Sequence, residues 1–358
     1  MTTMTNTTTK TLTVNHLPGE TWNWLKMNDA QVAVAPMSEE ITPTVDAPAA
    51  VSTVDSLLGK TAMPTGMGPD MEALTAPAKA LCFSAAGAVD APVRLGYRAR
   101  GGVQQIGAAA FTLAAGSTMT AVMDYTGDAA DAAAGTLALQ TKIQIGENAR
   151  LRLVQIHRAG EYIRVFNDVG ARCDAGGRLE VIHIMMNGGP TYVGCRADLV
   201  GEGSSLKADI GYLVENRGLL DMNYVANHLG KNTDSEINAS GVLRDTAEKL
   251  FRGTIDFKRG CGGSVGNEKE NVLLMDDAVV NKTIPLILCA EEDVEGNHGA
   301  TIGRLDDELL FYLESRGMNQ ADIYEMMAQS RIAAVCRLIP DAGTREALLK
   351  TLEGSGEA

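Results

Sequence analysis

Aromatic residues are scarce in this sequence: Phe, Trp and Tyr together make up 4% of 358 residues. Glycine, by contrast, occurs 38 times, and Val, Ile and Leu are abundant. A chain with few aromatics, many glycines and many β-branched residues favours short strands joined by tight corners. With 45% hydrophobic and 21% charged residues, the composition is that of a folded globular protein.

The sequence also lacks paired cysteines. Its six cysteines are scattered, without a C-x-x-C pair, which argues against a disulfide framework and against a zinc finger. No apolar run reaches the roughly 18 residues of a membrane span. The Thr-rich residues 1–10 lack the apolar stretch of a secretory signal. We therefore expect a cytoplasmic protein with reduced thiols and no membrane partner.

Positive charge is in short supply. The chain has 31 Lys and Arg residues against 45 Asp and Glu residues, a net charge of −14. This balance argues against nucleic acid as a partner, because binding the phosphate backbone needs a dense basic face. The sequence contains no G-x-x-x-x-G-K-[ST], G-x-S-x-G or H-E-x-x-H motif. We expect no ATP hydrolysis and no enzymatic activity from the chain itself.

What the sequence does have is a weak internal period. Between residues 137 and 290, short apolar runs alternate with turns of small residues. Three runs begin at Leu151, Leu179 and Leu206, which lie 28 and 27 residues apart. No long helical pattern interrupts this region, so stacked coils of a β-solenoid are favoured over a sheet with helical crossovers. A β-sandwich is the alternative on pattern alone.

The run that begins at Leu179 is largely apolar on both faces of the predicted strand. One face carries Leu179, Val181, His183 and Met185, and the other carries Glu180, Ile182 and Ile184. Such a strand is expected to be mostly buried on both sides.

The first 80 residues differ from this middle region. Residues 36–80 are rich in Ala, Pro, Thr, Met and Gly and are predicted to be mostly irregular or disordered, with one short helix near residues 52–58. Upstream, Trp22 and Trp24 are predicted to anchor the start of a helix against the core. We therefore expect an N-terminal segment of residues 1–80 and a β core of residues 81–304.

The last 54 residues, 305–358, have helical periodicity. Residues 306–316 form a first predicted helix that ends at Gly317, and residues 320–337 form a second with Asn319 as its N-cap. A third helix is predicted over residues 343–352. The sequence thus predicts a small helical domain after the β core.

Residues 290–317, AEEDVEGNHGATIGRLDDELLFYLESRG, closely resemble the C-terminal signature of SufD chains in the SufB/SufD family. The signature is an acidic stretch, then H-G-A-T-x-G, then an acidic helix with F-Y-L-x-S-R-G. Residues 15–18 and 21–28 also resemble the opening of SufD-type chains. The resemblance implies a mainly β fold: a right-handed parallel β-helix core, a small C-terminal α-helical domain and a partly irregular N-terminal region.

The resemblance also implies a function in iron–sulfur cluster assembly. Family members pair as SufB with SufD, and each binds one SufC, an ABC-type ATPase. A transient iron–sulfur cluster is proposed to form at the SufB–SufD interface, and no tightly bound cofactor is expected. The chain is accordingly expected to be a scaffold subunit of the SufB–SufC–SufD complex.

Three positions favour the SufD branch. Val279 stands where SufB-type chains carry a Cys, and Gly299 stands where they carry a Glu, whereas the SufD-type His298 is present. Many SufD chains have a Cys just before this histidine, but here residues 296–297 are Gly-Asn. Two alternatives stay open: a SufB-like homodimeric scaffold that works with SufC alone, and a β-solenoid enzyme such as a lyase or acyltransferase.

His298 is the main candidate for a role in cluster assembly or iron binding. A neutral imidazole is a good ligand for iron and can transfer protons near neutral pH. Cys289, nine residues upstream, and Cys261, in a Gly-rich turn, are weaker candidates. The acidic residues 291–295 lie beside His298 in the sequence.

The helical tail is the expected dock for SufC. Its apolar side chains could enter a groove of the partner, as amphipathic helices do. The candidate contact residues are Leu309, Phe311, Tyr312, Leu313, Ile323, Met326 and Met327.

Overall fold

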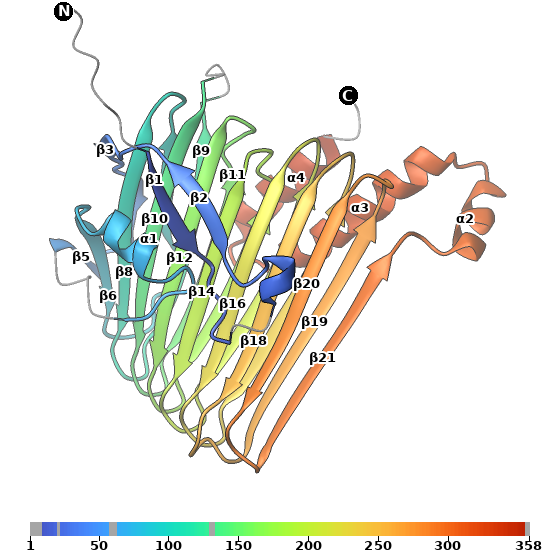
Figure 1. Ribbon diagram of the computed structural model, residues 1–358. Helices are drawn as coiled ribbons and strands as arrows, with labels where there is room; N and C mark the ends of the chain where they lie inside the picture. Colours follow the sequence, from blue (N-terminus) through green and yellow to red (C-terminus); the bar gives the residue numbers. More distant parts are fainter. Residues whose placement is uncertain (1–8, 20–21, 57–62, 129–132, 355–358) are drawn as a thin grey trace, which may run out of the picture.

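The computed structural model describes residues 9–19, 22–56, 63–128 and 133–354. Most of the chain winds into a parallel β-solenoid whose successive strands alternate between two sheets (Figure 1). Each turn therefore adds one strand to each sheet, and neighbouring strands come from successive turns. This confirms the predicted mainly β solenoid and excludes the sandwich, whose sheets are antiparallel.

The two sheets run the length of the solenoid. The first consists of β5 (Val51–Ser56), β6 (Ala80–Ala85), β8 (Gln104–Leu113), β10 (Gly135–Ile145), β12 (Ile163–Cys173), β14 (Thr191–Leu199), β16 (Leu219–His228), β18 (Glu248–Phe257) and β20 (Val280–Cys289), with β3 (Glu39–Glu40) beside β8. The second consists of β4 (Thr44–Asp46), β7 (Val93–Ala99), β9 (Thr118–Gly127), β11 (Arg150–Arg158), β13 (Arg178–Met185), β15 (Ser205–Val214), β17 (Asp234–Leu243), β19 (Ser264–Leu274) and β21 (Val294–Gly303). Only β4 and β5 run antiparallel to their neighbours in these described sheets.

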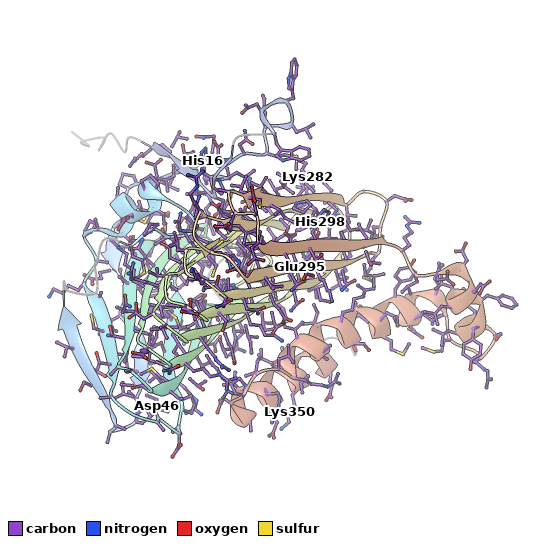
Figure 2. The ribbon with its side chains drawn as sticks, turned by 90° about the horizontal axis from the view of Figure 1, so that it is seen from below. His16, Asp46, Lys282, Glu295, His298 and Lys350 are labelled. Atoms are coloured by element: carbon purple, nitrogen blue, oxygen red, sulfur yellow. The ribbon has the colours of Figure 1, made fainter. Side chains whose placement is uncertain are left out.

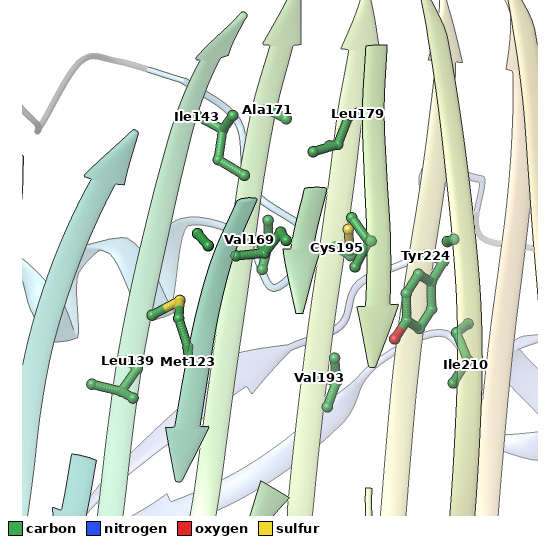
Figure 3. Close-up of a cluster of buried hydrophobic side chains, with 14 of the residues drawn as sticks. Met123, Leu139, Ile143, Val169, Ala171, Leu179, Val193, Cys195, Ile210 and Tyr224 are labelled. Carbon is green, nitrogen blue, oxygen red and sulfur yellow. The ribbon is translucent and has the colours of Figure 1, made fainter. Parts of the chain in front are cut away.

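The leucine period seen in the sequence is the register of the second sheet. Leu151 pairs with Leu179, and Leu179 pairs with Leu206, on successive turns. All three side chains are buried in the interior core between the sheets. Figure 3 shows part of this core, where side chains of both sheets point into the space between them.

The corners of the solenoid repeat with the same period. Asn148, Gly176 and Gly203 all have positive φ, at 53°, 62° and 68°. The N–H groups of these three residues donate to the carbonyls of Ala175, Glu202 and Lys231 on the following turn, at 2.8–2.9 Å. Asn and Gly recur here because a left-handed residue is needed to turn the chain tightly.

Both faces of the central strands are buried, as predicted for the run at Leu179. Val181 and Met185 belong to the interior core, whereas Ile182 and Ile184 pack beneath the C-terminal helices. The helix α3 (Gln320–Cys336) contacts β13, β15, β17 and α4 (Ala342–Gly354). Burial on both sides explains why the sequence of β13 does not alternate between apolar and polar residues.

The C-terminal helices begin where the sequence places their caps. The carboxylate of Asp306 accepts from the N–H groups of Glu308 and Leu309 at the start of α2 (Asp307–Glu314). The side chain of Asn319 accepts from the N–H of Asp322 at the start of α3. Figure 1 shows α2 projecting beyond the last strands of the solenoid. In the part of the chain that is described, no helix is long and apolar enough to cross a membrane.

The N-terminal region has more regular structure than its composition predicts. The hairpin of β1 (Lys10–Val14) and β2 (Ala30–Val34) packs with α1 (Pro69–Thr75) on the outer face of the first sheet. The predicted short helix near residues 52–58 is wrong: Val51–Ser56 is an edge strand paired with β6. Its Val and Thr residues suit an extended edge strand, and residues 57–58 lie outside the described part.

The prediction for the two tryptophans is also wrong. Trp22 and Trp24 flank or enter the short helix η1 (Asn23–Leu25), but their side chains are 37% and 98% exposed. The loop is fixed by polar contacts instead, because the side chain of Asn28 accepts from the N–H of Trp22 at 2.9 Å. The apolar anchors are Leu17 and Met27, which pack against Ile284 of β20.

Candidate functional site at the open end of the solenoid

The solenoid ends at β20 and β21 without a covering element among the described residues. Each of these ten-residue strands pairs on one side only, with β18 and β19 respectively. Residues 295–302 of β21 are all exposed. The outer edges of both strands therefore present unpaired backbone N–H and C=O groups.

His298 lies in the middle of this last strand. It is in register with Glu268 of β19. Residues in register on adjacent parallel strands project to the same side of the sheet, and Glu268 is buried inside the solenoid. His298 therefore faces the interior at its open end. Figure 2 shows it on the last strand with Glu295, while Lys282 lies on neighbouring β20.

A buried polar cluster lies behind His298. The carboxylate of Glu270 accepts from the ammonium of Lys249, from Thr283 Oγ1 at 2.7 Å and from the hydroxyl of Tyr212 at 3.2 Å. The side chains of Lys249 and Glu270 are 0% and 1% exposed. Burial lowers the pKa of Lys249, although the charge and hydrogen bond of Glu270 act in the opposite direction. Glu270 is thus fully partnered.

Glu268 is different, because one of its oxygens has no partner. The residue is 3% exposed, and Oε2 has no hydrogen-bond partner in the described part of the chain. Burial, with the nearby charge of Glu270, raises the pKa of Glu268 to about 8. The carboxyl group lies against Gly253 of β18, where a Cβ would be 2.4 Å from its carbon.

The two candidate cysteines lie at a corner rather than beside His298. Cys289 is the last residue of β20, and its exposed thiol donates to the carbonyl of Glu291 at 3.0 Å. Cys261 is buried in the turn after β18, and burial raises its pKa, with smaller effects from Glu291 and Cys289. His298 lies four residues into β21. The roles predicted for these cysteines remain predictions.

The acidic residues next to this corner have structural contacts. The carboxylate of Glu291 accepts from the N–H of Gly260 at 2.7 Å and from the N–H of Glu292 at 3.0 Å. These bonds lower the pKa of Glu291, the bond from Gly260 most. Glu291 therefore fixes the turn that carries Cys261.

The residues predicted to dock SufC divide into two groups. Ile323 is completely buried, and Leu313 and Met327 are half-buried against it. The exposed side chains are Leu309, Phe311, Tyr312 and Met326, at 37%, 73%, 54% and 38%. Only this second group can contact a partner without rearrangement of the helices.

A second polar network lies deeper in the solenoid and was not predicted. His183 Nδ1 is hydrogen-bonded to the hydroxyl of Tyr224, and Asn167 donates to the side chain of Gln155 at 2.7 Å. Burial lowers the pKa of His183 to about 3, so the imidazole is neutral. Its place on the inward face of β13 was the available signal in the sequence.

The fold and the open end define the chain as a parallel β-solenoid protein with a helical C-terminal extension and an uncovered last turn. Residues 98–331 match the family model described as "SUF system FeS cluster assembly, SufBD core domain". This match covers more than half of the chain, from β7 into α3. The chain belongs to the SufB/SufD family of the SUF system, as its C-terminal signature predicts.

Individual relatives include members of both branches. The chain is 25% identical over 216 residues to the iron-sulfur cluster assembly protein SufD of Bacillus subtilis (strain 168), covering 60% of this chain and 49% of the relative. It is 33% identical over 108 residues to SufD of Escherichia coli (strain K12), covering 30% of this chain and 26% of the relative. It is 28% identical over 113 residues to SufB of Bacillus subtilis (strain 168), covering 32% of this chain and 24% of the relative. The chain thus spans about half the length of these relatives, or less.

Proposed function

We propose that this chain is a SufD-like, non-catalytic scaffold subunit of a cytoplasmic SufB–SufC–SufD complex. It pairs with a SufB-type paralogue through the open end of the solenoid and docks a SufC-type ATPase through its C-terminal helices. A transient iron–sulfur cluster forms where the two solenoids meet. The observation that carries this proposal is the uncovered last turn, with two unpaired strands and His298 facing its interior.

The unpaired strands favour a partner with strands of its own. An exposed, ten-residue edge is a hazard for an isolated protein, and natural proteins usually shorten, charge or cover such edges. Here the edge of β21 has Ile302 at 41% exposure, and Val280 begins β20 at 36% exposure. Addition of a partner strand to each edge would satisfy the backbone groups and cover these side chains.

The exposed face of α2 favours a second protein contact. Phe311 and Tyr312 are large, exposed and adjacent on a helix that stands clear of the sheets (Figure 1). Exposed aromatic side chains of this kind often dominate the binding energy of protein interfaces. A shallow groove on an ATPase subunit would bury both rings.

The test is copurification of the full-length chain with a tagged SufC-type ATPase and a SufB-type paralogue from the same organism. The proposal expects a complex that contains all three proteins. A stable complex with the ATPase and a second copy of this chain, without the paralogue, would instead favour the homodimeric scaffold. Failure to bind either protein would refute the proposed function.

A further inference from the structure

The interior of the last turns contains one carboxylate too many for its cations. Lys249 is occupied by Glu270, which also accepts from Thr283 and Tyr212. Glu268 has no printed ion pair or hydrogen bond, and it is the only acidic residue among those described whose buried oxygen has no partner. A buried carboxylate without a counter-charge is costly unless a cation or proton accompanies it.

The fold holds this carboxylate open to one direction only. On one side it lies against the backbone of Gly253, which leaves no room between β18 and the carboxyl group. On the other side the next strand is β21, whose register partner for Glu268 is His298. Adjacent strands lie about 4.8 Å apart, so the two side chains start within reach of a shared ligand.

We propose that Glu268 and His298 form an open half-site for a divalent first-row transition cation, such as ferrous iron delivered as a substrate. The inference rests on the proposed function, because His298 is the residue assigned there to cluster assembly. A carboxylate oxygen and an imidazole nitrogen are both suitable ligands for iron. Glu268 adds an anionic ligand to a site that the sequence assigned to a histidine alone.

The half-site is completed by the partner protein or by water. The described residues contain no group of three His, Cys, Asp or Glu side chains that could hold a metal. Two protein ligands on an open face give weak binding, which suits a cation that must be passed on. Pairing of a second solenoid with β21 would bring further ligands to the exposed side of His298 and close the site.

The test uses the purified full-length chain, without partners, and Co(II) as the spectroscopic probe. We expect a weak 1:1 site, observed by titration calorimetry and visible absorption. Glu268→Gln and His298→Ala are each expected to weaken Co(II) binding at least about tenfold, which is the loss of one ligand. Glu295→Gln, on the same strand, is the matched control and is expected to bind Co(II) as the unaltered chain does.

Two results would overturn the proposal. One is Co(II) affinity that is unchanged in Glu268→Gln, and the other is equal loss in Glu295→Gln, which would indicate adventitious binding to surface carboxylates. Since Glu268→Gln could alter folding, anomalous scattering from Co(II) in crystals of the unaltered chain provides a second measurement. A cobalt peak remote from Glu268 and His298 would refute the site. Copurification is measured separately, so the half-site can fail while the three-protein complex still forms, and the reverse.

Discussion

Lys249 of β18 and Glu270 of β19 form an ion pair that is completely enclosed by the last turns of the solenoid, with side chains 0% and 1% exposed. The two residues come from opposite sheets and face each other across the interior. Because the pair is dry, removing one partner leaves an uncompensated buried charge, whose cost greatly exceeds that of an exposed pair.

Lys249→Met is therefore expected to lower the free energy of unfolding by about 3–5 kcal/mol. Chemical denaturation followed by circular dichroism measures the loss. The control is Lys207→Met, which breaks the exposed pair with Glu236 and should cost less than about 1 kcal/mol. Equal effects of the two substitutions would contradict the enclosed pair, and Lys249→Met combined with Glu270→Gln should recover part of the loss.

Gly253→Ala tests the close approach of Glu268 to β18. A methyl group there would meet the carboxyl group at 2.4 Å, so the side chain of Glu268 must move. We expect a loss of about 1–3 kcal/mol in unfolding free energy, the usual cost of overpacking. Gly299→Ala, where nothing lies within 4 Å, is the matched control and should be nearly neutral. Adding Glu268→Ala to Gly253→Ala should restore stability, and no rescue would show that the strain lies elsewhere.

His183 gives a pH dependence with a definite sign. Its pKa is lowered from 6.5 to about 3 in the folded chain by burial. Below pH 6.5 the unfolded chain takes up a proton that the folded chain does not, so this contribution to stability is complete above pH 6.5 and is lost as the pH falls toward 3. His183→Gln should remove up to about 1.4 kcal/mol per pH unit from the slope of stability in that range.

Urea unfolding of the His183→Gln variant at several pH values between 4 and 7 provides that measurement. His16→Gln is the control, because the His16 side chain is 45% exposed. An unchanged slope in the His183 variant would mean that its imidazole already accepts protons in the folded chain.

Phe311→Ala and Tyr312→Ala test the docking helix. Both rings are exposed, so neither substitution should change thermal stability. Each should weaken binding of a SufC-type ATPase by about tenfold or more if the rings are anchors of the interface. Ile323→Ala should do the opposite: it removes a buried side chain and should cost about 2–5 kcal/mol of stability. Unaltered ATPase binding by both aromatic variants would place the dock elsewhere.

Much of the fold was predictable because stacked turns repeat their own register. The spacing of Leu151, Leu179 and Leu206 is the sheet register, and the caps at Asp306 and Asn319 are local hydrogen bonds. Features that depend on contacts between turns were not predictable. Glu268 meets Gly253 only because two sheets face each other, and no local pattern signals that distance in space.

The errors have a related cause. Trp24 was expected to be buried on the basis of its size, but polar contacts of Asn28 hold the loop with the indole in solvent. The edge strand β5 was read as a helix because its pairing partner, β6, begins some 24 residues later. In both cases a tertiary contact outweighed the local preference.

The most direct test of the account is cluster reconstitution by the complete three-protein complex that carries His298→Ala. His298 is exposed and makes no printed hydrogen bond, so folding and assembly should be unaffected. The account predicts an intact complex with a clearly reduced yield of iron–sulfur cluster, measured by absorption and by iron and sulfide content. A yield equal to that of the unaltered complex would contradict the claim that the open end of the solenoid is where the cluster is built.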